Sequence, residues 1–411
     1  MERQRRRWLA LVTLLGSSLL GLALAEAAIR QIYGEGFGVL LDAYEDHPYR
    51  PYLRYQLAWG DLRYPLYTNS LGWKDAALDR RVPRDPGEAT RVVFLGDSFT
   101  EGLGFRQEAT LSGVAGQILD RSGGRYEVLN GGRNSYSPLL EYQRLRRFLE
   151  AGYRTDYVVL LPDVSDPVDE VLYGARYEFG PRGEPLRFQE PFYGPLVRGI
   201  YNRSALARSL RSFQKRLAAG PASSLPGRQP VPLPAVGTFT PRQFLALPPE
   251  VQMALRPNWP LHPPSLRGWA GQGLRSMLVN MERIRRLTAA RSIRLIVAIY
   301  PWPTMLYTRE DPHLYARLAR RFPAPFRDRE LVYGRGPGPR LTPYETALRD
   351  FCQHRSIPLV DLISEVQVNE RWEDLFLRGD VHFNEQGNRL AGMRIAAAIL
   401  AEVRKSPARS R

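Results

Sequence analysis

Two short segments near opposite ends of the chain carry the residue types that together perform nucleophilic catalysis. The first is Gly96–Thr100, with the sequence GDSFT, and the second is Asp380–Asn384, with the sequence DVHFN. A serine hydroxyl becomes a useful nucleophile when a neighbouring base removes its proton, and a carboxylate holds that base in the correct tautomer. The two segments therefore supply a candidate nucleophile in Ser98, a candidate base in His382 and a candidate orienting carboxylate in Asp380.

The residues around Ser98 predict how its hydroxyl is presented. The apolar run Val92–Leu95 precedes this segment, and Glu101-Gly102 follows it. This order is typical of a buried strand, a tight turn and the start of a helix. Ligand sites of open α/β sheets lie at the carboxyl ends of strands, and the unpaired N–H groups of a helix start can stabilise an oxyanion. We expect Asp97 to fix the turn through hydrogen bonds and to take no part in the chemistry.

Together the two segments resemble the first and last sequence blocks of the SGNH/GDSL hydrolase superfamily, which read G-D-S and D-x-H or D-x-x-H. The resemblance covers roughly residues 89–170 and 290–400. It implies an α/β fold with a doubly wound parallel sheet in a flavodoxin-like, three-layer arrangement. It also implies a membrane-anchored bacterial esterase or polysaccharide O-acetyltransferase in which Ser98 is the nucleophile, His382 the base and Asp380 the partner of the base.

The two middle blocks of the superfamily are matched only in part. Where the second block has a glycine, this chain has Ser135, with Gly132 close by. Where the third block has the asparagine of G-x-N-D, this chain has Ser165, whose hydroxyl reaches less far than an amide. Loss of one oxyanion donor costs about 100- to 1000-fold in rate, so the departures imply a slow enzyme, another donor, or an acyl acceptor other than water. The oxyanion donors that the resemblance implies are Ser98, Ser135, Gly132 and Ser165.

Strands and helices are predicted to alternate on both sides of a long insertion, which indicates a parallel, doubly wound sheet. The predicted strands are 91–95, 126–129, 157–161, 293–300 and 359–362, and the predicted helices are 111–121, 139–151, 273–290, 342–354 and 385–403. The expected organisation is an anchor (1–28), an aromatic-rich lead-in arm (29–88), the first part of the core (89–166), an insertion (167–272), the second part of the core (273–404) and a basic tail (405–411).

The insertion interrupts the regular alternation. Residues 221–234 carry several prolines, 257–264 is irregular, and 205–218 is predicted to be a basic helix. We interpret the insertion as a cap over the active-site edge that shapes the acceptor pocket. A partly disordered linker is the alternative for its Pro-rich part.

The N-terminus has the pattern of a membrane anchor. Arg3 and Arg5–Arg7 precede the apolar segment Trp8–Ala25, which is just long enough to cross a bilayer. The arginines are expected to stay in the cytoplasm, which places the rest of the chain in the periplasm, tethered to the inner membrane by a single pass. The sequence Ala23-Leu24-Ala25 before Glu26 also resembles a signal-peptidase site, and we favour a retained anchor because the apolar run is long.

The composition limits the class of partner. The formal charge is +16, and the only lysines are Lys74, Lys215 and Lys405. This excess of arginine reflects either genomic base composition or attraction to an anionic glycan or a membrane surface. No nucleic-acid-binding module is recognised and the basic residues are spread out, so no nucleic-acid partner is expected.

Histidine and cysteine usage point away from metal and disulfide chemistry. The five histidines stand singly, without the additional ligands of a two-metal site, and neither a metal nor a cofactor is expected. The one cysteine, Cys352, allows no internal disulfide and is expected to be a small core residue.

Three functions remain open from the sequence. The first is an extracytoplasmic serine esterase or acyltransferase that acts on acyl, most simply O-acetyl, esters of a carbohydrate. The second is a non-catalytic glycan-binding or scaffold subunit of an exopolysaccharide or cell-envelope system. The third is a lipase or phospholipase, which requires an apolar trough at the site.

Overall fold

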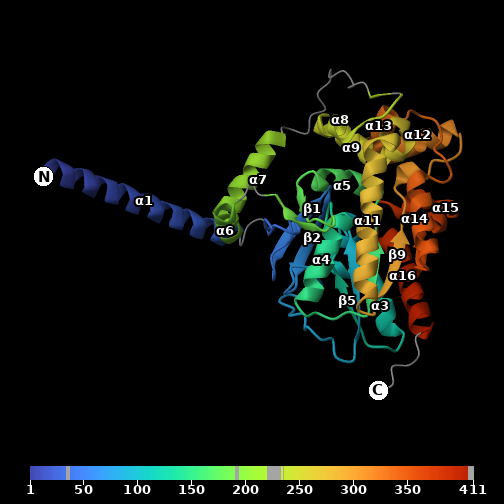
Figure 1. Cartoon of the computed structure of the whole chain (residues 1–411), viewed down its shortest axis with the longest axis horizontal. Coiled ribbons are helices and arrows are strands. Elements are labelled where there is room, and N and C mark those ends of the chain that lie inside the picture. The colour runs from blue at the N-terminus through green and yellow to red at the C-terminus, as the bar shows by residue number, and fades with distance from the viewer. Residues whose placement is uncertain (34–37, 190–193, 220–232, 235, 406–411) are drawn as a thin grey trace.

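The computed structural model describes residues 1–33, 38–189, 194–219, 233–234 and 236–405 (Figure 1). The predicted tail therefore lies outside the described residues except for Lys405. The centre of the molecule is an eight-stranded sheet in the order β1-β2-β3-β5-β4-β6-β9-β10. Its strands are β1 (Arg54–Trp59), β2 (Leu62–Thr68), β3 (Lys74–Asp75), β4 (Thr90–Gly96), β5 (Tyr126–Asn130), β6 (Tyr157–Leu161), β9 (Arg294–Ile299) and β10 (Leu359–Asp361).

The five strands of the core are parallel to one another and follow the flavodoxin-like order. Numbered in chain order, β4, β5, β6, β9 and β10 lie side by side as 2-1-3-4-5. In this topology the connections leave β4 toward opposite edges of the sheet, so a crevice forms between the carboxyl ends of β4 and β6. The predicted strands match the observed ones within one residue at each end.

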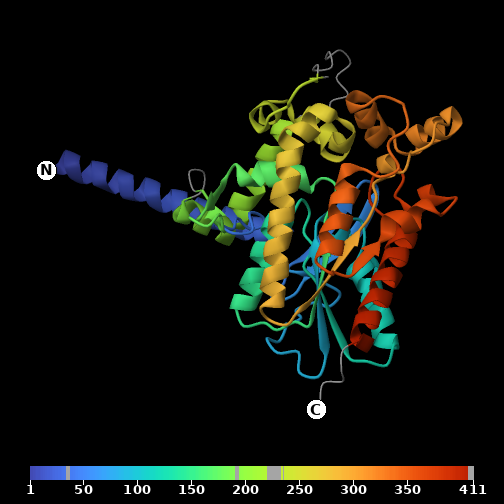
Figure 2. The same ribbon diagram turned by 45° about the vertical axis from the view of Figure 1, so that its right-hand side comes forward.

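Helices cover both faces of the sheet, as the predicted doubly wound α/β class requires (Figure 2). Alternate residues of β4 point to opposite faces, because side chains alternate along a strand. Val93 and Leu95 join one buried cluster, and Val92 and Phe94 join the other. The first face carries α4 (Pro138–Glu150), α11 (Trp269–Ala289) and α14 (Pro343–His354), and the second carries α3 (Leu111–Arg121) and α16 (Glu385–Lys405).

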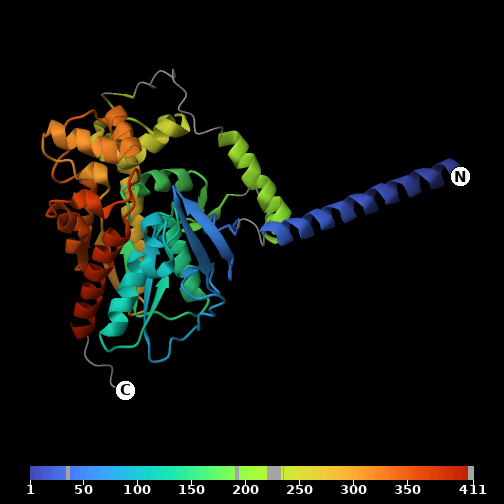
Figure 3. The same cartoon turned by 180° about the vertical axis from the view of Figure 1, so that it is seen from behind.

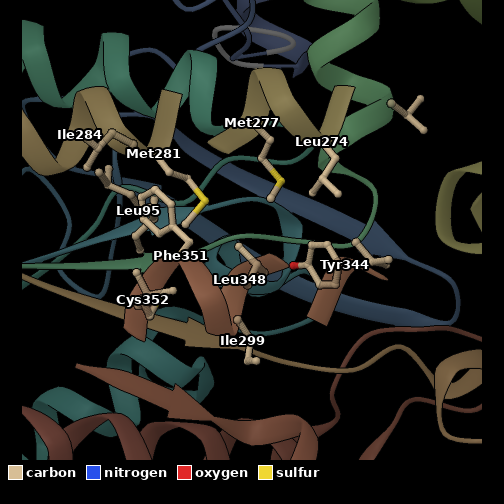
Figure 4. Close-up of a cluster of buried hydrophobic side chains, with 14 of the residues drawn as sticks. Leu95, Leu274, Met277, Met281, Ile284, Ile299, Tyr344, Leu348, Phe351 and Cys352 are labelled. Atoms are coloured by element: carbon tan, nitrogen blue, oxygen red, sulfur yellow. The ribbon is translucent and has the colours of Figure 1, made fainter. Parts of the chain in front are cut away.

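Figure 4 shows the first of these clusters, where Met277 and Met281 of α11 face Leu348 and Cys352 of α14. Cys352 is a buried free thiol, as the sequence predicts. The helices predicted around this core are confirmed, with two differences of more than one residue: α11 begins at Trp269 rather than at Gly273, and α16 ends at Lys405 rather than at Val403.

The lead-in is not an extended arm, and that prediction is wrong. Residues 54–68 form the antiparallel hairpin β1–β2, and β3 pairs this hairpin with β5, so the lead-in extends the central sheet. Alternate residues of β2 are buried, and Gly60-Asp61 forms the turn with Gly60 at φ +54°. A two-residue turn with glycine between alternating strands is a known hairpin signal. The hairpin was not predicted because the lead-in was interpreted from its aromatic composition rather than from this alternation.

The insertion contains more helix than expected. It begins with α5 (Asp166–Gly174), and its further elements are β7 (Tyr177–Phe179), β8 (Pro185–Phe188), α6 (Pro195–Arg203), α7 (Ala205–Ala219), α8 (Pro241–Leu245), α9 (Pro249–Asn258), η2 (Trp259–Leu261) and α10 (Pro263–Arg267). The predicted basic helix is α7. The Pro-rich residues 220–232 lie outside the described residues.

Short helices complete the chain around the sheet. Before β5 these are α2 (Ser98–Glu101) and η1 (Gln107–Ala109); after β9 they are η3 (Pro303–Met305), α12 (Pro312–Arg321), α13 (Pro323–Val332), α15 (Leu362–Gln367) and η4 (Trp372–Leu375). The helices α8, α9, α12 and α13 gather beyond the end of the sheet at which α11 begins (Figures 1 and 2).

The N-terminal helix α1 (Glu2–Tyr33) projects away from the rest of the molecule (Figures 1 and 3). Its most apolar stretch is not buried against the protein, and among the described residues it is the one helix long and apolar enough to cross a membrane. The structure thus supports the predicted span by length and composition.

A pair of glycines tests how closely α5 and α11 pack. A Cβ added to Gly273 would lie 2.1 Å from Pro167 O, whereas one added to Gly174 would meet nothing within 4 Å. Gly273→Ala should therefore lower the free energy of unfolding by about 1–3 kcal/mol. Gly174→Ala, the control in α5, should raise it by up to about 1 kcal/mol through helix propensity. Denaturant unfolding measures both, and equal effects of the two substitutions would contradict the packing described.

Candidate active site

The turn that carries Ser98 is fixed by side-chain packing and by a helix cap. Asp97 caps α2, because its Oδ1 accepts hydrogen bonds from Phe99 N at 2.9 Å and from Tyr300 Oη at 3.0 Å. A Cβ on Gly96 would lie 2.1 Å from Thr100 Oγ1, so only glycine fits at the end of β4. The structure confirms that Asp97 fixes the turn.

The three residues predicted from the two ends of the chain meet in one hydrogen-bonded line. His382 Nε2 lies 2.8 Å from Ser98 Oγ, across a sequence separation of 284 residues. On its other side, His382 Nδ1 lies 2.5 Å from Asp380 Oδ1, which also accepts from His382 N at 2.9 Å. This arrangement is that of a Ser-His-Asp triad. The structure brings the three residues together, and their catalytic roles remain predictions.

Aromatic rings enclose the imidazole. The Phe99 ring lies 4.7 Å from the His382 ring, centroid to centroid, and Phe383 packs edge-on against Phe99. Leu377 N donates to His382 O, and Phe376 pairs with Phe383 in an isolated bridge, so the loop is tied to itself on both sides of the histidine. Ser98 and His382 are each 7% exposed, so both residues are almost entirely shielded from solvent.

Trp59 completes the line and was not predicted. Its indole Nε1 donates to Asp380 Oδ2 at 2.8 Å, and its ring meets the His382 ring edge-on at 5.3 Å. Trp59 is the last residue of β1, so the hairpin of the lead-in reaches the carboxylate of the triad. The contact between Trp59 and Asp380 joins residues 321 positions apart, so no local pattern in the sequence predicts it.

The charges around His382 favour its protonated form. Burial alone would lower the pKa of His382, but the hydrogen bond and charge of Asp380, together with the charges of Asp97 and Asp163, raise it above its usual value of 6.5. Burial would raise the pKa of Asp380, and the hydrogen bonds from His382 and Trp59 lower it below its usual value. Asp380 therefore stays ionised beside a histidine whose proton affinity is increased.

Asp97 offers the hydroxyl of Ser98 a second acceptor. Ser98 Oγ donates to Asp97 Oδ2 at 3.1 Å. When His382 is protonated, its Nε2–H donates to Ser98 Oγ and the serine proton points to Asp97. When His382 is neutral, Nε2 can accept that proton instead. Burial and the charge of Asp163 raise the pKa of Asp97 to about 7. The protonation of Asp97 therefore affects the hydrogen bond of Ser98 both when His382 is protonated and when it is neutral.

The backbone N–H groups of the candidate oxyanion donors differ in whether they already donate a hydrogen bond within the protein. Gly132 N donates to Asn130 Oδ1 at 3.0 Å, so it has no proton for an oxyanion. A Cβ on Gly132 would lie 2.4 Å from Glu101 N, and close packing is its observed role. Among the described residues, Ser98 N and Ser135 N donate to no protein acceptor, and Ser135 has φ +60°. These two N–H groups are the ones available.

The third block presents a carboxylate rather than an amide. Asp163 follows β6, and it accepts hydrogen bonds from Ser165 N and from Trp302 Nε1, both at 2.7 Å. Ser165 is buried, and its hydroxyl has no partner within the described part of the chain. The structure therefore leaves the Ser165 hydroxyl free and adds Asp163 and Trp302 to the site. Neither addition was predicted, because the contact between Asp163 and Trp302 joins residues 139 positions apart in the sequence.

A buried ion pair holds the second block against the turn of the nucleophile. Glu101 is fully buried and accepts from Asn134 N at 2.7 Å, from Tyr49 Oη at 2.8 Å and from Arg133 Nη1 at 3.1 Å. Arg133 stacks over the Tyr49 ring at 3.8 Å. Glu101 thus joins the first block, the second block and the lead-in, and it fixes the backbone just before Ser135.

Comparison with known proteins finds similar solved structures but no matching sequence. No protein-family model and no curated protein matches the sequence. Among solved structures, the chain is similar to the acetyl xylan esterase AlAXEase (12% identity, 75% of this chain and 99% of that one, TM-score 0.37). It is also similar to the psychrotrophic esterase EstA from Pseudoalteromonas sp. (10%, 77% and 100%, 0.36) and to a lipolytic G-D-S-L family protein from Veillonella parvula (11%, 75% and 97%, 0.34). At TM-scores below 0.5 these similarities carry no functional argument.

The contact of Trp59 with Asp380 predicts a positioning role. Trp59→Phe keeps the ring and removes the N–H, so the carboxylate loses one donor and kcat should fall about tenfold, the equivalent of ~1.4 kcal/mol. The pKa of Asp380 should rise in the same variant. Trp269→Phe is the matched control, because its Nε1 donates to Ser265 Oγ in the insertion and its loss should leave kcat unchanged. Ester hydrolysis over a pH series measures both, and a folded Trp59→Phe variant with wild-type kcat and pH profile would disprove the role.

The raised pKa of His382 predicts where activity is lost at low pH, which is the acid limb of the pH profile. His382 must be neutral to accept a proton, so kcat/KM should be lost as the pH falls through a value above 6.5. Asp97→Asn removes a negative charge that raises this pKa, while the amide oxygen can still cap Phe99 N. The limb should then move about one pH unit lower. Asp120→Asn, at an exposed position in α3, should leave it in place. A limb below pH 6.5, or one that Asp97→Asn does not move, would contradict the electrostatic account.

Proposed function

We propose that this chain is a membrane-anchored, extracytoplasmic serine esterase or O-acyltransferase that acts on acyl esters, with O-acetyl esters of a carbohydrate as the substrate class. The observation that carries the proposal is the hydrogen-bonded line from Ser98 Oγ through His382 to Asp380. The line is buried among aromatic rings at the crevice between β4 and β6, where the topology of the sheet favours a ligand site.

The first half of the reaction forms an acyl-enzyme. Ser98 Oγ attacks the acyl carbonyl carbon while its proton passes to His382 Nε2, and Asp380 stabilises the imidazolium. The carbonyl oxygen becomes an oxyanion, for which the N–H groups of Ser98 and Ser135 are the proposed donors. When the carbonyl re-forms, the bond to the alcohol breaks, and the departing alkoxide takes the proton from His382.

The second half releases the acyl group to an acceptor. His382 removes a proton from water or from a sugar hydroxyl, whose oxygen attacks the acyl carbon and displaces Ser98 Oγ. His382 then returns the proton to the serine. Water yields a carboxylic acid, whereas a sugar hydroxyl yields a new ester. Every group that this sequence of steps requires comes from the chain, so the proposal includes neither a metal nor a cofactor.

The carbohydrate substrate and the location rest on the sequence and on α1. The two outer sequence blocks resemble those of membrane-linked proteins that modify exopolysaccharides or cell-wall glycans. The arginines before Trp8 favour a cytoplasmic N-terminus. This orientation would place the catalytic domain in the periplasm, tethered to the inner membrane by α1. The apolar groove beside α1 is lined by residues of α1, α6 and α7 and by none of the triad, so it is not the apolar trough at the site that a lipase requires.

A chromogenic acetate ester tests the proposed chemistry. Wild-type protein should hydrolyse it, and Ser98→Ala should reduce kcat about 10⁴-fold or to background, since the nucleophile is lost. Ser122→Ala, at the end of α3 and away from the triad, is the control and should keep full activity. Mass analysis of rapidly quenched enzyme should find the acyl group on the peptide that contains Ser98.

The acyl-enzyme on Ser98 also identifies the acyl acceptor, water or a sugar hydroxyl. Release of the acyl group by water alone assigns a hydrolase, and faster release with an oligosaccharide, together with an acylated sugar product, assigns a transferase. Unchanged hydrolysis by Ser98→Ala would remove Ser98 from the mechanism. Absence of any acyl-enzyme and of any turnover in folded wild-type protein would favour the glycan-binding alternative.

A further inference from the structure

The helices α6 and α7 lie outside the α/β body and have no part in the triad. They follow the β7–β8 hairpin in the chain, pack against each other, and lie beside the C-terminal end of α1 (Figures 1 and 3). In both views α7 runs across the end of α1 rather than along it. We call this pair the side helices.

The side helices expose an apolar face. In α6, Leu196 and Ile200 are 75% and 56% exposed, and in α7, Leu210 and Phe213 are 54% and 59% exposed. The spacing of four and three residues places each pair on one side of its helix. Val197, 52% exposed, adds to the face of α6. A contiguous exposed apolar surface of this kind indicates contact with a partner or a membrane.

Polar contacts fix the side helices to α1. Glu26 accepts hydrogen bonds from Ala205 N at 2.8 Å, Leu206 N at 2.9 Å and Ser204 Oγ at 2.8 Å, so it caps the start of α7. Arg30 Nη2 donates to Arg203 O at 2.7 Å, at the end of α6. Both contacts come from the last turns of α1, beyond its most apolar part, where a spanning helix leaves the acyl region.

Other polar contacts fix which face of α6 points away from the body. Asn202 exchanges two hydrogen bonds of 2.9 Å with the backbone of Leu41, one to its N–H and one to its carbonyl. Arg208 of α7 is buried and donates to Asn202 O at 2.7 Å. The polar side of the pair is therefore held against the protein, and the apolar side faces outward.

An apolar groove joins the side helices to α1. Its volume is about 1000 Å³, and its lining includes Leu22 of α1, Leu196 and Ile200 of α6, and Leu206 and Leu210 of α7. The groove is continuous with the exposed apolar surface of α1. Leu22 belongs both to the apolar surface of α1 and to the lining of the groove. If the C-terminal part of that surface contacts lipid, the groove contacts lipid as well.

We propose that the side helices lie in the headgroup–acyl boundary of the bilayer that α1 spans, with their apolar side chains in the acyl region and a lipid acyl chain in the groove. An amphipathic helix in this position buries its apolar face about 5–10 Å into the boundary. Because Glu26 holds the start of α7 and Arg30 holds the end of α6 against α1, the pair sets the orientation of the catalytic domain relative to the membrane. The inference rests on the proposed anchor and is independent of the triad chemistry.

Depth-resolved fluorescence quenching tests the inference on the full chain. In a Cys352→Ser background, a polarity-sensitive fluorophore is attached to Ile200→Cys or Phe213→Cys, and the protein is reconstituted into phosphatidylethanolamine–phosphatidylglycerol vesicles. Leu15→Cys in α1 is the control for the anchor, and Val279→Cys, 49% exposed on α11, is the control for the body. The labels at 200 and 213 should be quenched by lipids with a nitroxide near the headgroup, the label at 15 by lipids with a deep nitroxide, and the label at 279 by neither.

Three results would overturn the inference. If the labels at 200 and 213 remain unquenched and water-exposed while the label at 15 is quenched, the anchor stands and the side helices lie outside the bilayer. If their emission is blue-shifted without quenching by either lipid, protein rather than lipid covers the face. If the label at 15 also escapes quenching, the membrane anchor itself is disproved.

Discussion

The contact between His382 Nε2 and Ser98 Oγ is the interaction on which the rest of this architecture depends, because it closes a loop of 284 residues. Two geometries make it possible. Parallel pairing of β4 with β5 and β6 places Ser98 at the crevice of the sheet. The packing of α16 on α3 and of Phe383 on Phe99 brings the loop before α16 to the same place. Sheet topology thus converts two distant sequence segments into one site.

The surroundings of the triad are charged although they are buried. Asp380 is partly buried and receives three hydrogen bonds, from His382 N, His382 Nδ1 and Trp59 Nε1, and hydrogen bonds of this kind favour the ionised carboxylate. Asp97 and Asp163 add negative charge on the far side of Ser98 and strengthen the basicity of His382. The same acids carry structural hydrogen bonds, from Tyr300 and Trp302, so the turn geometry and the proton affinity of the base are coupled.

The sequence was a good guide to the core because its signals are local. Apolar runs such as Val92–Leu95, bounded by glycine and by helical periodicity, are sufficient to define strands of a parallel sheet. The helices α8, α9 and α10 were not predicted. They begin at Pro241, Pro249 and Pro263, and proline is favoured at the first position of a helix, so these prolines are helix starts within a segment whose prolines suggest irregular structure. The contacts of Trp59 and Asp163 could not be predicted, since each depends on how distant segments pack rather than on any spacing in the chain.

Ser98 is proposed to be the activated nucleophile of one preassembled site. A crystal structure of the protein after reaction with an aryl alkylphosphonate ester tests it most directly, because the phosphonate imitates the tetrahedral intermediate. The account predicts a covalent bond from Ser98 Oγ to phosphorus, with a phosphoryl oxygen within hydrogen-bond distance of Ser98 N and Ser135 N and with His382 still bonded to Asp380. A phosphonate attached to another residue, or an unmodified Ser98 beside an intact triad, would contradict it.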